Sequence, residues 1–140
     1  MSLPEDIVLD QIRGDLIGQA WPLMAMYFAR ACHRVPTHLT PDLILYRAQT
    51  RQSDLWAIYD KTCPLPLLAA ASTALRGSIM TIESIGGRDM KRWLRPALAR
   101  FEQLAREHGV TEIEVEGRFA WQRLLPGYEP KRIAMRKILK

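Results

Sequence analysis

The sequence has few cysteines, no long apolar run and no leader-like beginning, and each absence excludes a class of protein. Cys32 and Cys63 are the only cysteines and lie outside any C-x-x-C unit, which favours two free thiols over a disulfide framework. No apolar run reaches the roughly 18 residues that cross a bilayer, so no membrane partner is expected. The segment "MSLPEDIVLD" is acidic and lacks the basic start and apolar centre of a signal peptide. We therefore expect the protein in a cytoplasm.

Several catalytic and metal-binding motifs are also missing. The sequence contains no Walker loop and no G-x-G-x-x-G, and Ser78 and Ser84 lack the G-x-S-x-G surround of a hydrolase nucleophile. His33, His38 and His108 are far apart, and no histidine or cysteine pair has the spacing of metal ligands. No metal is expected.

Positive charge is concentrated in the second half of the chain. Residues 1–60 hold five Lys/Arg against seven acids, a net −2, whereas residues 61–140 hold fifteen against eight, a net +7. A basic half suits an anionic partner, such as a nucleotide cofactor, nucleic acid or an acidic surface. The alternative is a solvated basic face. The length of 140 residues predicts a single domain over 1–140.

Hydrophobic spacing predicts the order of helices and strands. A helix over 15–20 restarts at Pro22 and ends near 33–34, and Thr40-Pro41-Asp42 begins another. Because Pro96 would interrupt a helix interior, the next regular helix is placed from about Arg95 to 108, where Gly109 ends it. A short helix is expected over 118–125. Strands are expected at 55–59, 67–75, 78–85, 111–117 and 131–139.

This order predicts an α/β (α+β) fold with a mixed central sheet and helices on both faces. Both faces of the strand at 78–85 are apolar, as expected of a central strand. The alanine-rich strand at 67–75 should have another element packed closely against it. The segment 78–116 should form a parallel β–α–β unit.

The stretch "SIGGRDMKRWL" contains the best candidate for a ligand site. A helix that begins there would direct unpaired N–H groups at a loop, and Gly86 and Gly87 would let a ligand approach the backbone. Basic side chains surround it, namely Arg88, Lys91, Arg92 and Arg95. This arrangement could hold a pyrophosphate. The alternative is a strand-to-helix turn whose basic residues face water.

Two side chains are candidates for proton transfer. Glu83 lies in an otherwise apolar strand two residues before the glycines, so it could act as a base near a bound cofactor. Alternatively, Glu83 reaches solvent or pairs with an arginine. Tyr128 could be a proton donor or a core ring with its hydroxyl at the surface. The tail "KRIAMRKILK" could contact nucleic acid, but it lacks the interleaved aromatics of single-strand binders.

From Trp21-Pro22 onward the chain resembles the GNAT superfamily of N-acetyltransferases, and more narrowly the small GNAT-fold proteins of tailed bacteriophages and prophages. The residues that carry the resemblance are "DLWAIYD" (54–60), "IESIGGRDMKRWL" (82–94), "FEQLAREHGVTEIEVEGRFAWQRLLPGYE" (101–129) and "MRKIL" (135–139). They extend the resemblance over about six-sevenths of the chain and imply a single GNAT-like domain.

The resemblance implies an acetyltransferase that moves acetyl from acetyl-CoA to an amine. In the family, the helix after the fourth strand directs its N-terminus at the pyrophosphate of acetyl-CoA. Here that maps onto Ile85, Gly86, Gly87, Arg88, Lys91, Arg92 and Trp93. Glu83 is then the candidate base and Tyr128 the candidate acid. The phage resemblance implies the cytoplasm of a bacterial host, or packaging in a virion.

Two departures from the family pattern favour alternatives. The glycines of the usual R/Q-x-x-G-x-G/A loop would fall between Met90 and Leu94, where the sequence has none, and Arg123 stands at the usual position of the tyrosine acid. One alternative is a catalytically inactive phage accessory or virion structural protein whose partners are other phage proteins. Another is a basic, nucleic-acid-associated or host-modifying phage protein. The sequence leaves these open.

Overall fold

In the part of the chain that the structure describes, five strands form one mixed sheet in the order β1-β2-β3-β4-β5. The computed structural model describes residues 4–34 and 39–115. The strands are β1 (Ile7–Gln11), β2 (Asp54–Asp60), β3 (Ala69–Arg76), β4 (Ile79–Gly87) and β5 (Glu112–Val115). Neighbours are antiparallel from β1 to β4, and β5 is parallel to β4.

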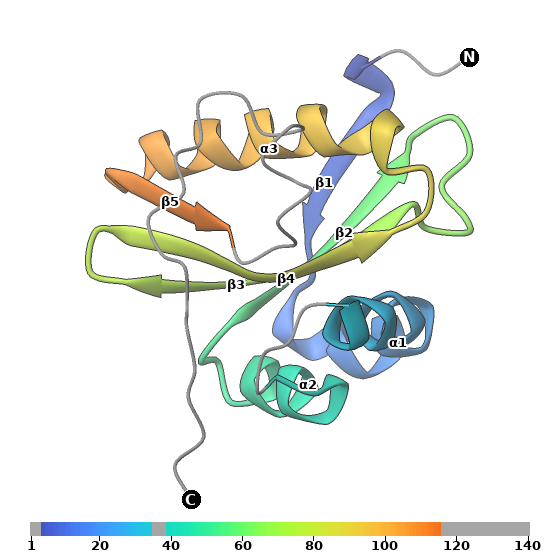
Figure 1. The fold of residues 1–140 in the computed structure, drawn as a ribbon, viewed down its shortest axis with the longest axis horizontal. Coiled ribbons are helices and arrows are strands. Elements are labelled where there is room, and N and C mark those ends of the chain that lie inside the picture. The colour runs from blue at the N-terminus through green and yellow to red at the C-terminus, as the bar shows by residue number, and fades with distance from the viewer. Residues whose placement is uncertain (1–3, 35–38, 116–140) are drawn as a thin grey trace, which may run out of the picture.

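Among the described residues, three helices cover the two faces of this sheet. They are α1 (Ile17–Arg34), α2 (Pro41–Gln49) and α3 (Met90–Glu107), with short 3-10 turns η1 (Pro4–Asp6) and η2 (Gly14–Leu16). Helix α3 lies on one face, and α1 and α2 lie on the other (Figure 1). The predicted fold class, the mixed sheet and the parallel β4–α3–β5 unit are confirmed.

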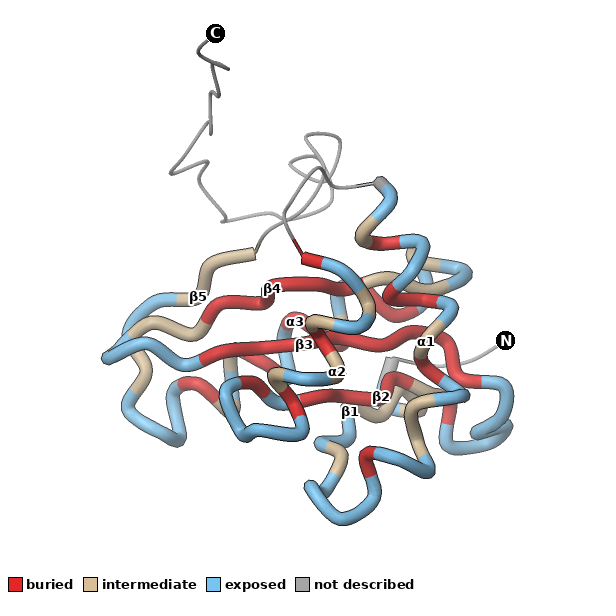
Figure 2. The backbone as a smooth tube through the Cα atoms, turned by 90° about the horizontal axis from the view of Figure 1, so that it is seen from below, coloured by how far each residue is buried: buried red, intermediate tan, exposed pale blue. Residues whose placement is uncertain are grey.

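Each face of the sheet has its own hydrophobic core. On the α3 side, Trp93 and Phe101 are fully buried, and the ring of Phe101 meets Trp56 edge-on at 5.1 Å. On the other side, Met24 and Phe28 of α1 pack with Ile44 of α2. The buried residues run along the middle strands (Figure 2). Apolar burial on both faces therefore explains why β4 is apolar on both sides.

The side chains of strand β3 are small and take up little space between the sheet and the helices. Ala69, Ala70 and Ala71 are 0% exposed, and their methyl groups let the flanking helices approach the sheet. The predicted alanine-rich strand with a closely packed neighbour is confirmed.

Local sequence signals locate several boundaries correctly. The Thr40 hydroxyl accepts a hydrogen bond of 3.1 Å from the Leu43 amide and so caps α2. Gly77 (φ 62°) makes the β3–β4 turn, and Gly109 (φ 74°) follows the end of α3. Both adopt the left-handed region that glycine enters most easily.

The structure adds one strand and corrects three predictions about where elements begin or end. Strand β1 was not predicted. Helix α1 is continuous through Pro22, and α3 begins at Met90 and continues through Pro96. Strand β4 does not end at residue 85 but continues to Gly87. In each helix the buried face continues past the proline, so packing outweighs the lost backbone hydrogen bond.

Three predictions fall outside the described residues, namely the helix at 118–125, the strand at 131–139 and the extent of one domain over 1–140. Among the helices of the described ranges, none has the length and apolar character needed to cross a membrane.

Candidate functional site

A bulge in β4 marks the beginning of the candidate site. The β3–β4 register pairs Ser72 with Ser84 but Thr73 with Ile82, so Glu83 is the extra residue. The bulge shifts the side-chain alternation by one position. As a result, Ile82 and Ile85 both join the core under α3, although they are three residues apart.

The pairing of β4 with β5 ends at the same place. Its register runs from Ile79↔Glu112 to Ile82↔Val115. Beyond Ile82, no strand in the described ranges pairs with β4 on the β5 side. The last five residues of β4, from Glu83 to Gly87, therefore present an edge whose backbone groups can bind a ligand.

Glu83 is held by arginines from other parts of the fold. Its side chain is 6% exposed, Oε2 accepts a hydrogen bond of 2.6 Å from Arg47 of α2, and Arg76 at the end of β3 lies 3.8 Å away. Oε1 is buried without a hydrogen-bond partner among the described residues. Of the alternatives left open by the sequence, the structure shows Glu83 paired with an arginine. The Oε1 atom remains available to accept a proton. Its role as a base remains a prediction.

The N-terminus of α3 follows directly after this strand edge. Asp89 precedes the helix with φ 53°, its side chain does not cap the helix, and the first turn contains no acidic residue. A helix cannot satisfy the amides of its own first turn. With cations nearby and no cap, this helix end is suited to an anion.

The two glycines before α3 serve packing rather than a flexible loop. Gly86 and Gly87 lie in β4 opposite Ala70 and Ala69. A Cβ on Gly86 would lie 3.0 Å from the Tyr27 carbonyl oxygen, so α1 covers that face of the strand. The prediction that the strand ends before this pair is wrong, because the ladder with β3 extends through both residues.

The predicted cofactor-binding residues divide into exposed cations and packed side chains. Arg88, Lys91 and Arg92 are exposed, whereas Ile85 and Trp93 are buried. The indole N–H of Trp93 donates to the Arg88 carbonyl at 2.7 Å and so fixes the turn into α3.

Two of these cations also hold the loop between β2 and β3. The Arg88 amide donates to the Leu68 carbonyl at 2.8 Å, and its guanidinium lies 3.3 Å from the Pro66 carbonyl. Arg92 donates to buried Asp60 at 2.9 Å. Sequence reasoning missed Asp60 and Arg47, because the pairings join residues 32 and 36 positions apart.

Tyr128 lies outside the described residues, so its predicted role as an acid stays a prediction. The described part of the chain contains no group of three or more His, Cys, Asp or Glu side chains that could hold a metal ion.

The chain was compared with known families, curated proteins and solved structures, and only the solved structures are similar to it. No family model matches the chain, and no curated protein matches its sequence. Solved structures do match. An aminoglycoside acetyltransferase from an uncultured soil metagenomic sample, in complex with sisomicin, superposes with a TM-score of 0.65 at 8% identity, over 97% of this chain and 98% of that one.

Two further structures extend the likeness. A ribosomal-protein-alanine N-acetyltransferase from Brucella melitensis biovar Abortus 2308 has a TM-score of 0.60 at 13% identity, covering 96% of this chain and 99% of that one. An aminoglycoside N-acetyltransferase in complex with CoA has a TM-score of 0.58 at 11% identity, covering 94% of each chain. The predicted GNAT-like fold is thus confirmed.

Proposed function

We propose that the protein is an N-acetyltransferase that binds acetyl-CoA and transfers its acetyl group to an amine. The observation that carries the proposal is the position of the uncapped, basic N-terminus of α3 directly after the β4 edge that β5 leaves unpaired in the described ranges. There, the two negative charges of the CoA pyrophosphate would lie next to free backbone amides and basic side chains. The CoA complex of a protein with the same fold supports this assignment.

Lys91 is the side chain best placed to contact the pyrophosphate. It is exposed in the first turn of α3. Arg88 and Arg92 add positive charge while they hold the loop between β2 and β3. The amides proposed to bind the diphosphate are those of Asp89, Met90 and Lys91, because the Arg88 amide already donates to Leu68.

The proposed chemistry needs a base, an acid and alignment of the two reactants. Acetyl-CoA supplies the acetyl group as a thioester, and attack by a neutral amine forms the amide while the C–S bond breaks and the CoA thiol leaves. In the proposal, Oε1 of Glu83 accepts the proton that the ammonium loses. Tyr128 is the proposed donor to the departing thiolate. The β4 edge would hold the reactants in line.

Isothermal titration with acetyl-CoA tests the proposal directly. We expect saturable binding with Kd on the order of 1–100 μM in low salt. Binding that does not saturate by about 1 mM, with a protein that remains folded, would contradict it.

A charge reversal separates binding at the helix end from a general charge effect. Lys91→Glu should weaken acetyl-CoA binding about tenfold by repelling the diphosphate, yet leave α3 equally or slightly more stable, because an acid in the first turn favours the helix dipole. The matched control is Arg100→Glu, which reverses the charge of an exposed cation in the same helix, nine residues after Lys91. Equal loss of affinity in both variants would argue against a site at the helix end.

We also propose a second candidate, a non-catalytic GNAT-fold protein such as an accessory or virion component of a bacteriophage. Two observations favour it, since Arg47 fixes Glu83 and the guanidinium groups of Arg88 and Arg92 are bonded to protein groups. This candidate predicts a folded protein without acetyl-CoA binding in the titration above. The bacterial host cytoplasm or a virion is the proposed location for either candidate.

A further inference from the structure

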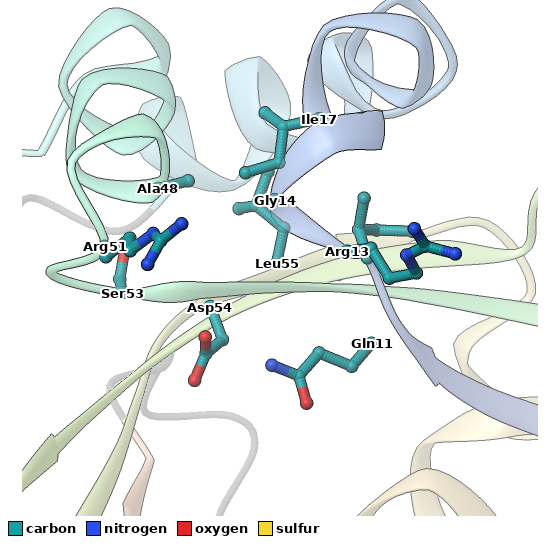
Figure 3. Close-up of a pocket in the computed structure, with 10 residues that line it drawn as sticks. Gln11, Arg13, Gly14, Ile17, Ala48, Arg51, Ser53, Asp54 and Leu55 are labelled. Atoms are coloured by element: carbon teal, nitrogen blue, oxygen red, sulfur yellow. The ribbon is translucent and has the colours of Figure 1, made fainter.

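A hollow lies at the end of the sheet opposite the α3 N-terminus. The register pairs Ile7 with Asp60 at the α3 end and Gln11 with Trp56 toward the other end. There, β1 leaves β2 and the chain turns into η2, beside the end of α2 (Figure 3). The hollow has a volume of about 440 Å³, within the range of sites for small molecules. We call it the β1–β2 notch.

The inner wall of the notch is apolar. Ile17 of α1, Ala48 of α2 and Leu55 of β2 are buried and line it. These side chains come from three different elements, so their positions are set by the packing on the α1 and α2 side of the sheet. A ligand with a short aliphatic body would bury its own apolar surface against this wall.

A buried hydroxyl in the same wall lacks a partner. Ser53 lines the notch and is 7% exposed, and its Oγ has no hydrogen-bond partner in the part of the chain that the structure describes. Buried polar atoms are nearly always hydrogen-bonded. Rotation about the Ser53 side chain would turn this hydroxyl toward a ligand in the notch.

A cation stands next to Ser53. Arg51 projects into the space below Ala48 (Figure 3), and its guanidinium forms no ion pair within the described ranges. Arg13, across the notch, is paired with Asp15 at 2.9 Å. Arg51 is therefore the group available for a carboxylate, for which its planar fork of N–H donors is suited.

We propose that the β1–β2 notch binds a small carboxylate with a short aliphatic body. Its carboxylate would contact the Arg51 guanidinium and the Ser53 hydroxyl, and its body would lie against the apolar wall formed by Ile17 and Leu55. The side chains of Asp54 and Gln11 point to the other side of β2 (Figure 3).

Titration of the full chain with 4-methylpentanoate and with leucine tests the proposal and separates its two sources. We expect at least one of them to bind saturably, with Kd on the order of 0.1–1 mM. Tighter binding of leucine would assign the site to an amino acid, whereas tighter binding of 4-methylpentanoate would assign it to a simple carboxylic acid. Absence of saturation by either at about 10 mM would overturn the proposal.

Two variants locate the binding. Arg51→Met removes the charge but keeps an aliphatic stem, and it should weaken binding at least about tenfold, while Arg100→Met on α3 should not change it. Ser53→Ala should weaken binding severalfold without loss of thermal stability, because it removes a hydroxyl that has no partner. Unchanged affinity in both Arg51→Met and Ser53→Ala would overturn the assignment. Acetyl-CoA titrations of these variants should be normal, so this test is independent of the proposed acetyl transfer.

Discussion

At the residue scale, one carboxylate oxygen of Glu83 is fixed by an arginine and the other is left to take part in chemistry. Burial of its carboxylate is compensated at Oε2 by Arg47, whose side chain is itself only 17% exposed. A buried charge that loses its partner is costly, whereas a buried pair replaced as a whole by apolar residues often costs little. The pair therefore fixes α2 against β4 and leaves Oε1 as the one unengaged oxygen of Glu83.

Removing one member of this pair should be worse than removing both. Arg47→Met leaves the buried Glu83 carboxylate with only the exposed Arg76, 3.8 Å away, and we expect the free energy of unfolding to fall by about 3 kcal/mol. The double variant Arg47→Met/Glu83→Met should recover most of that loss. Urea unfolding measures both changes, with Arg100→Met as the exposed control. A double variant that loses the sum of the two single effects would show that the pair does not act as a unit.

At the element scale, the approach of α1 to β4 depends on a missing side chain. A Cβ on Gly86 would lie 3.0 Å from the Tyr27 carbonyl oxygen and 3.1 Å from the Ala31 Cβ. The Tyr27 hydroxyl also donates to the Leu67 carbonyl, so α1 is anchored both to β4 and to the segment that leads into β3. The glycine that was expected to let a ligand approach the backbone is thus a contact point of α1.

Gly86→Ala should therefore separate α1 from the sheet slightly and destabilise the protein by about 1–3 kcal/mol. The matched control is Gly18→Ala, near the beginning of α1, where an added Cβ meets nothing within 4 Å. That substitution should stabilise the helix by about 0.5 kcal/mol. Thermal denaturation of the two variants gives the comparison. Equal effects of the two alanines would mean that the packing at Gly86 is loose.

At the scale of the whole molecule, two partly buried acidic side chains, the Cys32 thiol and the Tyr59 phenol, link stability to pH. Burial raises the pKa of the Cys32 thiol. Burial, followed by the negative charge of Asp10 and a hydrogen bond to it, raises the pKa of Tyr59. In both cases folding favours the neutral form, so the unfolded chain loses these protons at lower pH than the native protein.

The free energy of unfolding should consequently decline as pH rises. The stabilising contribution is complete below the ordinary values of 9.0 for the thiol and 10.0 for the phenol, and it is lost as pH rises through the higher folded-state values. Urea unfolding between about pH 7 and pH 10.5 measures the slope. The double variant Cys32→Ala/Tyr59→Phe should show a flatter decline in this window. An unchanged slope would contradict the assignment to these two groups.

The sequence specified most elements of the fold through local signals. The threonine cap before α2, the glycine after α3 and the spacing of the α3 stripe each depend on neighbours within one or two turns. Such signals failed where packing opposed them. The helices continue through Pro22 and Pro96 because buried residues on either side hold them to the sheet.

The sequence predicted only part of the candidate site. Residues 83–93 form one continuous segment, so its glutamate, cations and helix start could be recognised together. The groups that engage it could not be recognised, because Arg47 and Asp60 lie in α2 and β2. The β1–β2 notch gave no signal at all, since Ser53 and Arg51 have no distinctive spacing.

The sequence alone determined the order and type of most elements, the basic character of the α3 start and the presence of a carboxylate in a buried strand, since each depends on residues close together in the chain. Only the tertiary structure decided which of these groups are free. Long-range contacts place α1 over Gly86, Arg47 against Glu83 and β5 beside only the first part of β4. Whether a charge or an amide can bind a ligand depends on what the rest of the fold has already placed against it.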